Sequence, residues 1–197
     1  MKNWTLRQRI LASFAVIVAI MLLMVVVSYS RLLKIEASQE SVRDDAVPGV
    51  YLSSMIRSAW VDSYLLTIDI IGLRADKTLT SADKTDFKSF EARIEQQMAN
   101  YEKTVNSQAD RMEFDNFKAA HINYNKALAE VLARIEANDL PGASVLVEEQ
   151  LTPIWTEGRM KLNDIITENK SVSDRATSAI DESVLSAKVS MAVSLII

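Results

Sequence analysis

The sequence contains no cysteine, one histidine, four glycines and three prolines among its 197 residues. Without cysteine, neither a disulfide framework nor a thiolate metal site can form. So little glycine and proline argues against a loop-rich or all-β protein and favours long helices. None of the glycines belongs to a phosphate-binding loop, so the sequence gives no sign of a nucleotide enzyme.

The single histidine also limits cofactor chemistry. A histidine-rich zinc site cannot form. Di-iron bundles use Glu-x-x-His, but the residue three positions before His121 is Lys118. Met/His haem ligation stays open as an alternative because the chain has eight methionines, although a hydrogen-bonded core histidine is the commoner case. With 26 acidic and 22 basic residues, the chain lacks the basic excess of a nucleic-acid-binding protein. We expect no cofactor, no nucleic-acid partner and no enzyme activity.

A charge-free apolar run occupies residues 10–30. At ~1.5 Å per helical residue these 21 residues span roughly 31 Å, which matches a bilayer core of ~30 Å. Basic residues without an acid precede the run, which places residues 1–9 in the cytoplasm by the positive-inside rule. A cleaved signal peptide is the alternative, but the run is long for one and no A-x-A site follows it. The sequence therefore predicts a transmembrane helix.

A second apolar segment, residues 189–197, closes the sequence. Nine helical residues cover only about 13 Å and cannot cross a bilayer. The segment is either an apolar tail or the start of a second, truncated span, which we favour. Residues 31–188 then form a domain between two membrane segments.

Within that domain, apolar residues recur at alternating spacings of three and four, the pattern of a buried helix face. Four such series imply an all-α protein, an antiparallel up-down four-helix bundle continuous with the transmembrane helices. The series are Leu52, Ile56, Ala59, Ser63, Leu66, Ile70 and Leu73; Phe87, Phe90, Ile94, Gln97 or Met98, Tyr101 and Val105; Phe114, Phe117, His121, Tyr124, Leu128, Val131 and Ile135; and Leu162, Ile165, Asn169, Val172, Ala176, Ala179 and Ser183.

Breaks between the series fall at 72–83, 106–108 and 138–142. Thr152 and Pro153 have the residue types of a helix N-cap and first helical position, so we expect the fourth helix to begin there. Pro48 is expected to kink the first helix.

The best candidate binding residues lie on the first bundle helix. Arg57, Trp60 and Tyr64 have i, i+3 and i+7 spacing and share one face. An arginine between two aromatic rings suits a carboxylate with an apolar body, because guanidinium binds carboxylate in bidentate fashion. Alternatively, the two rings pack at a helix or subunit interface and Arg57 pairs with an acid.

Other helices offer further candidates. Thr152 and Trp155 open the predicted fourth helix, which lies beside the first in an antiparallel bundle. Tyr124 and His121 point inward from the third helix. Each is more typical of a cap, an anchor or a core residue than of a ligand contact.

Three stretches resemble the N-terminal half of a bacterial methyl-accepting chemotaxis receptor. They are MKNWTLRQRILASF before the apolar run, PGVYLSSMIRSAWVDSYLL on the first bundle helix, and NDLPGASVLVEEQLTPIWTEGRMKL before the fourth. The resemblance implies a periplasmic sensor in the inner membrane, a homodimer formed mainly through the first helix, and a ligand site at the membrane-distal end. It also implies piston-like signalling to a cytoplasmic coiled coil that controls a histidine kinase with its adaptor, all beyond this sequence.

By that resemblance, Arg57 matches the first carboxylate-binding arginine of the aspartate-type receptors. The positions of their further arginines are Asp62 and Leu66 here, which disfavours aspartate. The aromatic residues suit an aromatic or less polar carboxylate. Three alternatives stay open: the same sensor as the input of a histidine kinase or cyclic-nucleotide enzyme, a ligand-free structural bundle, and an electron-transfer bundle.

Overall fold

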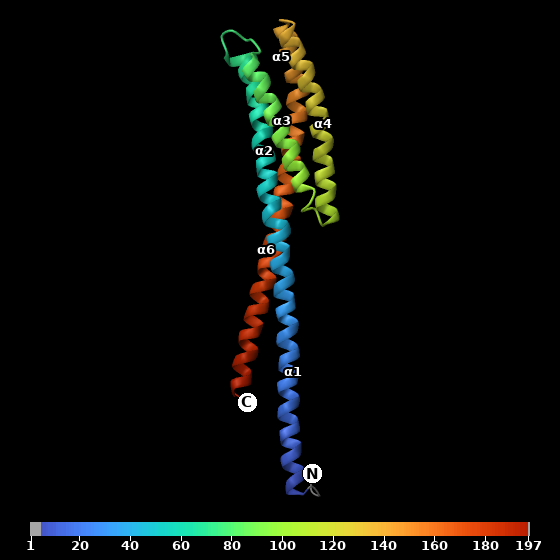
Figure 1. Cartoon of the computed structure of the whole chain (residues 1–197), viewed down its shortest axis with the longest axis vertical. Helices are drawn as coiled ribbons and strands as arrows, with labels where there is room; N and C mark the ends of the chain where they lie inside the picture. Colours follow the sequence, from blue (N-terminus) through green and yellow to red (C-terminus); the bar gives the residue numbers. More distant parts are fainter. Residues whose placement is uncertain (1–4, 197) are drawn as a thin grey trace. The chain divides into compact units, whose positions relative to one another are not determined.

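The structure is a computed structural model that describes residues 5–196, and every regular element in that range is helical. This confirms the all-α prediction. The elements are α1 (Leu6–Glu40), η1 (Ser41–Ala46), α2 (Val47–Ile68), η2 (Asp69–Leu73), α3 (Ser81–Tyr101), α4 (Gln108–Glu136), α5 (Leu140–Leu146), η3 (Val147–Leu151) and α6 (Thr152–Ile196), where η denotes a π-helix (Figure 1).

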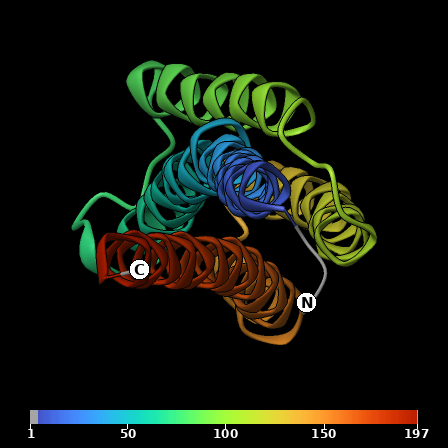
Figure 2. The same cartoon turned by 90° about the horizontal axis from the view of Figure 1, so that it is seen from below.

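The chain divides into two compact units, one made of Val42–Ser173 and the other of the two chain ends. In the first unit α2, α3, α4 and the first part of α6 run side by side as an up-down bundle (Figure 2). Contacts between α2 and α6 pair Gly49 with Asn169 and Tyr64 with Thr152, so the two helices are antiparallel. This unit is the helical bundle discussed below.

Helix-capping residues define three of the helix starts. The Thr80 side chain accepts a hydrogen bond from the Asp83 amide, and the Asp83 carboxylate accepts one from the Thr80 amide, which forms a capping box for α3. Ser107 caps α4, and Asp139 caps α5 by accepting a hydrogen bond from the Gly142 amide at 3.0 Å.

Observed burial agrees best with the predicted apolar series on α4, where every residue of the series is buried. On α2 the agreement is partial. Ile56, Ala59, Ser63 and Ile70 are buried, but Leu73 is 78% exposed, so its prediction as a core residue was wrong. The buried face also includes Ser53, Trp60 and Thr67, which are not members of the predicted series. The α2 core face is therefore wider than predicted.

Two prolines lie two residues after the end of a π-helical segment. Pro48 comes after η1, and Pro153 comes after η3. A proline inside an α-helix clashes with the carbonyl four residues earlier and cannot donate a hydrogen bond to it. The wider π-turn accommodates this without ending the helix.

The α-helix α6 begins at Thr152, as predicted, but the prediction that Thr152 is its N-cap was wrong. Thr152 has helical backbone angles (φ −62°, ψ −44°), and helical residues continue unbroken from Leu140. The true N-cap is Asp139, with Pro141 in the first turn of α5. Since its hydroxyl is not needed for capping, Thr152 can bond to another helix.

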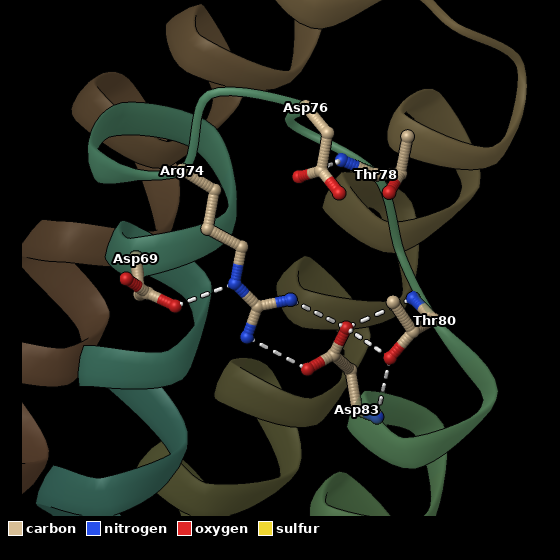
Figure 3. A network of polar contacts seen from close by, with 6 residues as sticks. All are labelled: Asp69, Arg74, Asp76, Thr78, Thr80 and Asp83. Carbon is tan, nitrogen blue, oxygen red and sulfur yellow. Dashed lines mark hydrogen bonds and ion pairs between the residues drawn. The ribbon is translucent and has the colours of Figure 1, made fainter.

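An ion-pair network fastens the connection between η2 and α3 (Figure 3). The Arg74 guanidinium donates to both Asp83 carboxylate oxygens at 2.7 and 2.8 Å, and its Nε donates to Asp69 at 2.7 Å. Asp83 also accepts hydrogen bonds from the Thr80 amide and hydroxyl. These bonds hold the pKa of Asp83 well below its usual range, the hydrogen bonds from Arg74 being the main cause.

The second unit contains the apolar N-terminal run. The helix that begins at Leu6 includes an 18-residue window of mean hydropathy 3.2, none of it buried, so it is long and apolar enough to cross a membrane. An N-terminal signal sequence would meet the same criterion. In this unit Arg31 donates a hydrogen bond to the Ser190 hydroxyl at 3.1 Å.

Candidate functional site

The centre of the candidate site is Trp60, a side chain with no exposed surface. Its ring lies 4.4 Å from that of Tyr124 and 5.3 Å from that of Phe117, centroid to centroid. Its indole Nε1 donates to the backbone carbonyl of Trp155 at 3.2 Å. Trp60 thus joins α2 to both α4 and α6.

Gly158 makes room for this indole. A Cβ at Gly158 would lie only 2.5 Å from Cζ2 of Trp60. Because real Cβ atoms do not approach other atoms so closely, any side chain here must displace the indole. The glycine, one turn after Trp155, is a feature that the sequence reasoning missed.

A second group of side chains lies nearer the surface of the same α2–α6 contact. The rings of Tyr64 and Trp155 stack with centroids 4.2 Å apart and an interplanar angle of 15°. The Tyr64 hydroxyl shares a 2.9 Å hydrogen bond with the Thr152 hydroxyl. The Arg159 guanidinium lies over the Trp155 ring, 5.0 Å from its centroid. We call Tyr64, Thr152, Trp155 and Arg159 the surface cluster.

Trp155 has one unused donor. Its indole Nε1 is buried and has no hydrogen-bond partner among the described residues. Buried polar groups are nearly always paired, and an unpaired one needs an explanation. A bound acceptor would supply it.

The structure separates Arg57 from the aromatic residues with which the sequence grouped it. Arg57 is exposed, whereas Trp60 points into the core and Tyr64 stacks on α6. The sequence therefore identified the residues of the α2–α6 contact, namely Trp60, Tyr64, Tyr124, Thr152 and Trp155, but not their division between core and surface. Arg159 is the basic residue that the structure places directly on this group.

Tyr124 and His121 face inward from α4, as expected. The Tyr124 hydroxyl bonds to the Ser63 hydroxyl at 3.0 Å, and burial raises the pKa of Tyr124. His121 is 4% exposed, and its Nε2 lies 3.3 Å from a carboxylate oxygen of Glu91. The hydrogen bond from His121 is the main reason why the pKa of Glu91 is lowered. Both residues therefore have structural partners.

One hollow, of about 280 Å³, lies beside Thr152 and is lined by Ile68, Ile71, Gly72, Ser144, Val147 and Glu148. Among these described residues the only charged side chain is that of Glu148, so the hollow does not suit an anion. Another hollow, of about 430 Å³, lies between α3 and α4 and is lined by no residue of the surface cluster. Its wall contains Lys88, Glu91 and Glu95. Residues 5–196 contain no group of three or more acidic, histidine or cysteine side chains that could hold a metal ion.

The bundle is thus an up-down arrangement in which α2 and α6 share an aromatic and cationic contact. The family model described as a four helix bundle sensory module for signal transduction matches residues 3–184 of this chain. The chain belongs to this family, which confirms the resemblance to the sensors of methyl-accepting chemotaxis proteins. Neither the curated proteins nor the solved structures that were compared gave a match.

Proposed function

We propose that this chain is the sensor region of a transmembrane chemoreceptor that binds a small carboxylate outside the cytoplasm. In this proposal residues 1–9 are cytoplasmic, 10–30 span the inner membrane, 31–188 form the periplasmic domain, and 189–197 begin a second span. The sensory-module family and the apolar, unburied N-terminal helix support this arrangement.

The surface cluster is the proposed ligand contact, and the observation that carries the proposal is the unpaired Trp155 Nε1 beside the Tyr64–Trp155 stack. An indole N–H and a guanidinium both donate to carboxylate oxygens, and the stacked rings offer an apolar surface. A carboxylate with an aromatic or apolar body fits these donors.

Helix geometry indicates on which side of the stack the anion would lie. Arg159 follows Trp155 by one turn, about 6 Å along α6, and Arg57 precedes Tyr64 by seven residues, about 10 Å along α2. Because the helices are antiparallel, both arginines lie on the same side of the stack. Glu148 borders the hollow on the other side and repels an anion. We therefore expect the carboxylate between the stack and the two arginines.

Transmission follows from the position of the site. A ligand that contacts α2 and α6 together favours one spacing of these helices, and it shifts the equilibrium only by its differential affinity for the two states. We propose that the receptor is a homodimer and that α6 transmits the signal to the cytoplasmic histidine kinase and adaptor.

Isothermal titration calorimetry of the full chain in nanodiscs tests the proposal, with benzoate, phenylacetate and succinate as probes and benzylamine as the ring-matched cation. We expect benzoate or phenylacetate to bind and benzylamine not to bind. Arg159→Ala should weaken binding at least about tenfold, because a charge-assisted hydrogen bond is worth ~1.5–3 kcal/mol.

Trp155→Phe separates the donor from the stacking surface, because it retains a ring and removes the N–H. Lys161→Ala, an equal loss of charge farther along α6, is the matched control and should leave affinity unchanged. Binding that is equally strong for benzylamine, or that survives loss of both Arg57 and Arg159, would rule out this carboxylate site.

A further inference from the structure

A buried polar layer crosses the bundle far from the surface cluster. The Tyr101 hydroxyl of α3 donates to Oδ1 of Asp110 on α4 at 2.5 Å, and Nδ2 of Asn169 on α6 donates to the Tyr101 hydroxyl at 2.7 Å. All three residues are at most 4% exposed. Gly49 of α2 lies against the Asn169 amide, where a Cβ would be 2.0 Å from Oδ1. One chain of contacts thus links all four helices.

A second buried acid belongs to this layer. Asp45 of η1 is 6% exposed and hydrogen-bonds to the side chain of Asn106, in the α3–α4 connection. It lies close enough to Asp110 and Tyr101 for its charge to act on both. We call Asp45, Tyr101, Asn106, Asp110 and Asn169 the polar layer.

The polar layer does not satisfy its acids fully. Oδ2 of Asp110 is buried without a hydrogen-bond partner among the described residues. A buried carboxylate with a free oxygen loses hydration that nothing replaces. The charge of Glu168 on α6 repels the ionised Asp110 carboxylate, and the charge of Arg111 on α4 offsets this repulsion only in part. A bound proton is the smallest ligand that removes this imbalance.

We infer that the polar layer is a proton-binding site through which this end of the bundle responds to external pH. It requires no organic ligand and uses none of the residues of the surface cluster. Burial raises the pKa of Asp110, and nearby Asp45 adds to the increase, while the hydrogen bond from Tyr101 opposes it. Burial likewise raises the pKa of Asp45.

The direction of the response follows from linkage. When the folded state has the higher pKa, it binds more protons than the unfolded chain, so stability is greatest below the ordinary aspartate pKa and falls as pH rises through the raised one. Ionisation leaves repelling charges in a dry layer and loosens the contact of Gly49 with Asn169. Acid restores the contact, so protonation favours close packing of α2 on α6.

Infrared titration of the full chain in nanodiscs tests the inference through the carbonyl stretch of the protonated acid. As the pH is lowered, a protonated buried carboxyl should appear at a higher pH than the carboxyls of exposed aspartates, and it should be absent in Asp110→Asn. Exposed Asp86 is the matched control, because Asp86→Asn should leave that band unchanged. A wild-type Asp110 band that titrates together with exposed aspartates would overturn the inference.

Two further variants give shifts of opposite sign. Asp45→Asn removes a like charge and should lower the Asp110 midpoint, whereas Tyr101→Phe removes a donor to the carboxylate and should raise it. Residues with a merely structural role would not shift the Asp110 midpoint in opposite directions. Equal midpoints in both variants would contradict the proposed coupling.

The absence of cysteine permits a direct measurement of helix spacing. Spin labels introduced by Val47→Cys and Lys170→Cys, both at exposed positions flanking the Gly49–Asn169 contact, should report closer approach in acid by continuous-wave spectroscopy. In the Asp110→Asn background the spacing should not depend on pH. A wild-type spacing that stays constant over the pH range in which the Asp110 band titrates would refute the conformational part of the inference, whether or not a carboxylate ligand binds the surface cluster.

Discussion

At the residue scale, Gly158 has a specific steric role in the bundle. Its missing side chain lets Trp60 sit fully buried between three helices, and a Cβ would be 2.5 Å from the indole. We expect Gly158→Ala to destabilise the protein by about 1–3 kcal/mol, because overpacking a dense core forces side chains out of position. Chemical denaturation followed by circular dichroism measures the change.

Gly72 is the matched control for this substitution. It is also helical, but a Cβ there meets nothing within 4 Å. Gly72→Ala should therefore be neutral or stabilise by up to about 1 kcal/mol through reduced freedom of the unfolded chain. Equal destabilisation by both variants would show that contact with Trp60 does not control the effect.

Asp83 permits a pH-dependent prediction. Its pKa is lowered chiefly by the hydrogen bonds from Arg74 (Figure 3). A lowered folded-state pKa means that the ion pair stabilises above the ordinary aspartate range and that this stability is lost as pH falls through the depressed pKa. Asp83→Asn should lower the melting temperature at neutral pH, and the difference from wild type should narrow in acid.

Thermal melts across the pH range measure this effect. Asp76→Asn, in the same connection but exposed, should not change the melting temperature. A difference between Asp83→Asn and wild type that stays constant into strong acid would mean that side-chain geometry, not charge, accounts for the loss.

At the element scale, the starts of α5 and α6 distinguish two uses of a capping-type residue. Asp139 accepts the Gly142 amide and caps α5, whereas Thr152 lies inside a continuous helical segment and bonds to Tyr64. Asp139→Ala should fray α5 and accelerate amide hydrogen exchange in Leu140–Leu146. Thr152→Val, which preserves shape, should leave exchange in that segment unchanged. Faster exchange in Thr152→Val alone would show that Thr152, rather than Asp139, caps this helical segment.

The error at Thr152 shows what the sequence pattern could not resolve. A threonine followed by proline is typical of a helix start, but the same pair is tolerated inside a helix when a π-turn precedes the proline. Val147 and Leu151 of that π-turn are buried, and η3 packs against α4, so its geometry depends on tertiary contacts. Periodicity therefore predicted the number of bundle helices and most of the buried face, because burial on one side is a local pattern, but not the helical continuity before Thr152.

The candidate site was predictable to a similar extent. Spacing identified the aromatic residues of the α2–α6 contact, because i, i+3 and i+7 positions lie near one another on any helix. It could not show that Trp60 turns inward, since that depends on Gly158 of another helix. It also missed the polar layer, because Asp45 and Asp110 are far apart in the sequence and come near one another only in the folded bundle.

At the scale of the whole molecule, the proposed topology can be tested because the chain contains no cysteine. Single cysteines at exposed sites can therefore be labelled without background. We expect Asn123→Cys, on α4, to react with a membrane-impermeant maleimide added to intact cells whose outer membrane is permeabilised. Thr5→Cys, before the apolar run, should react only after lysis, because the basic residues around it retain it in the cytoplasm. If the residue 123 position reacted only after lysis, the bundle would face the cytosol, and the proposed reception of external carboxylate and external pH would both fail.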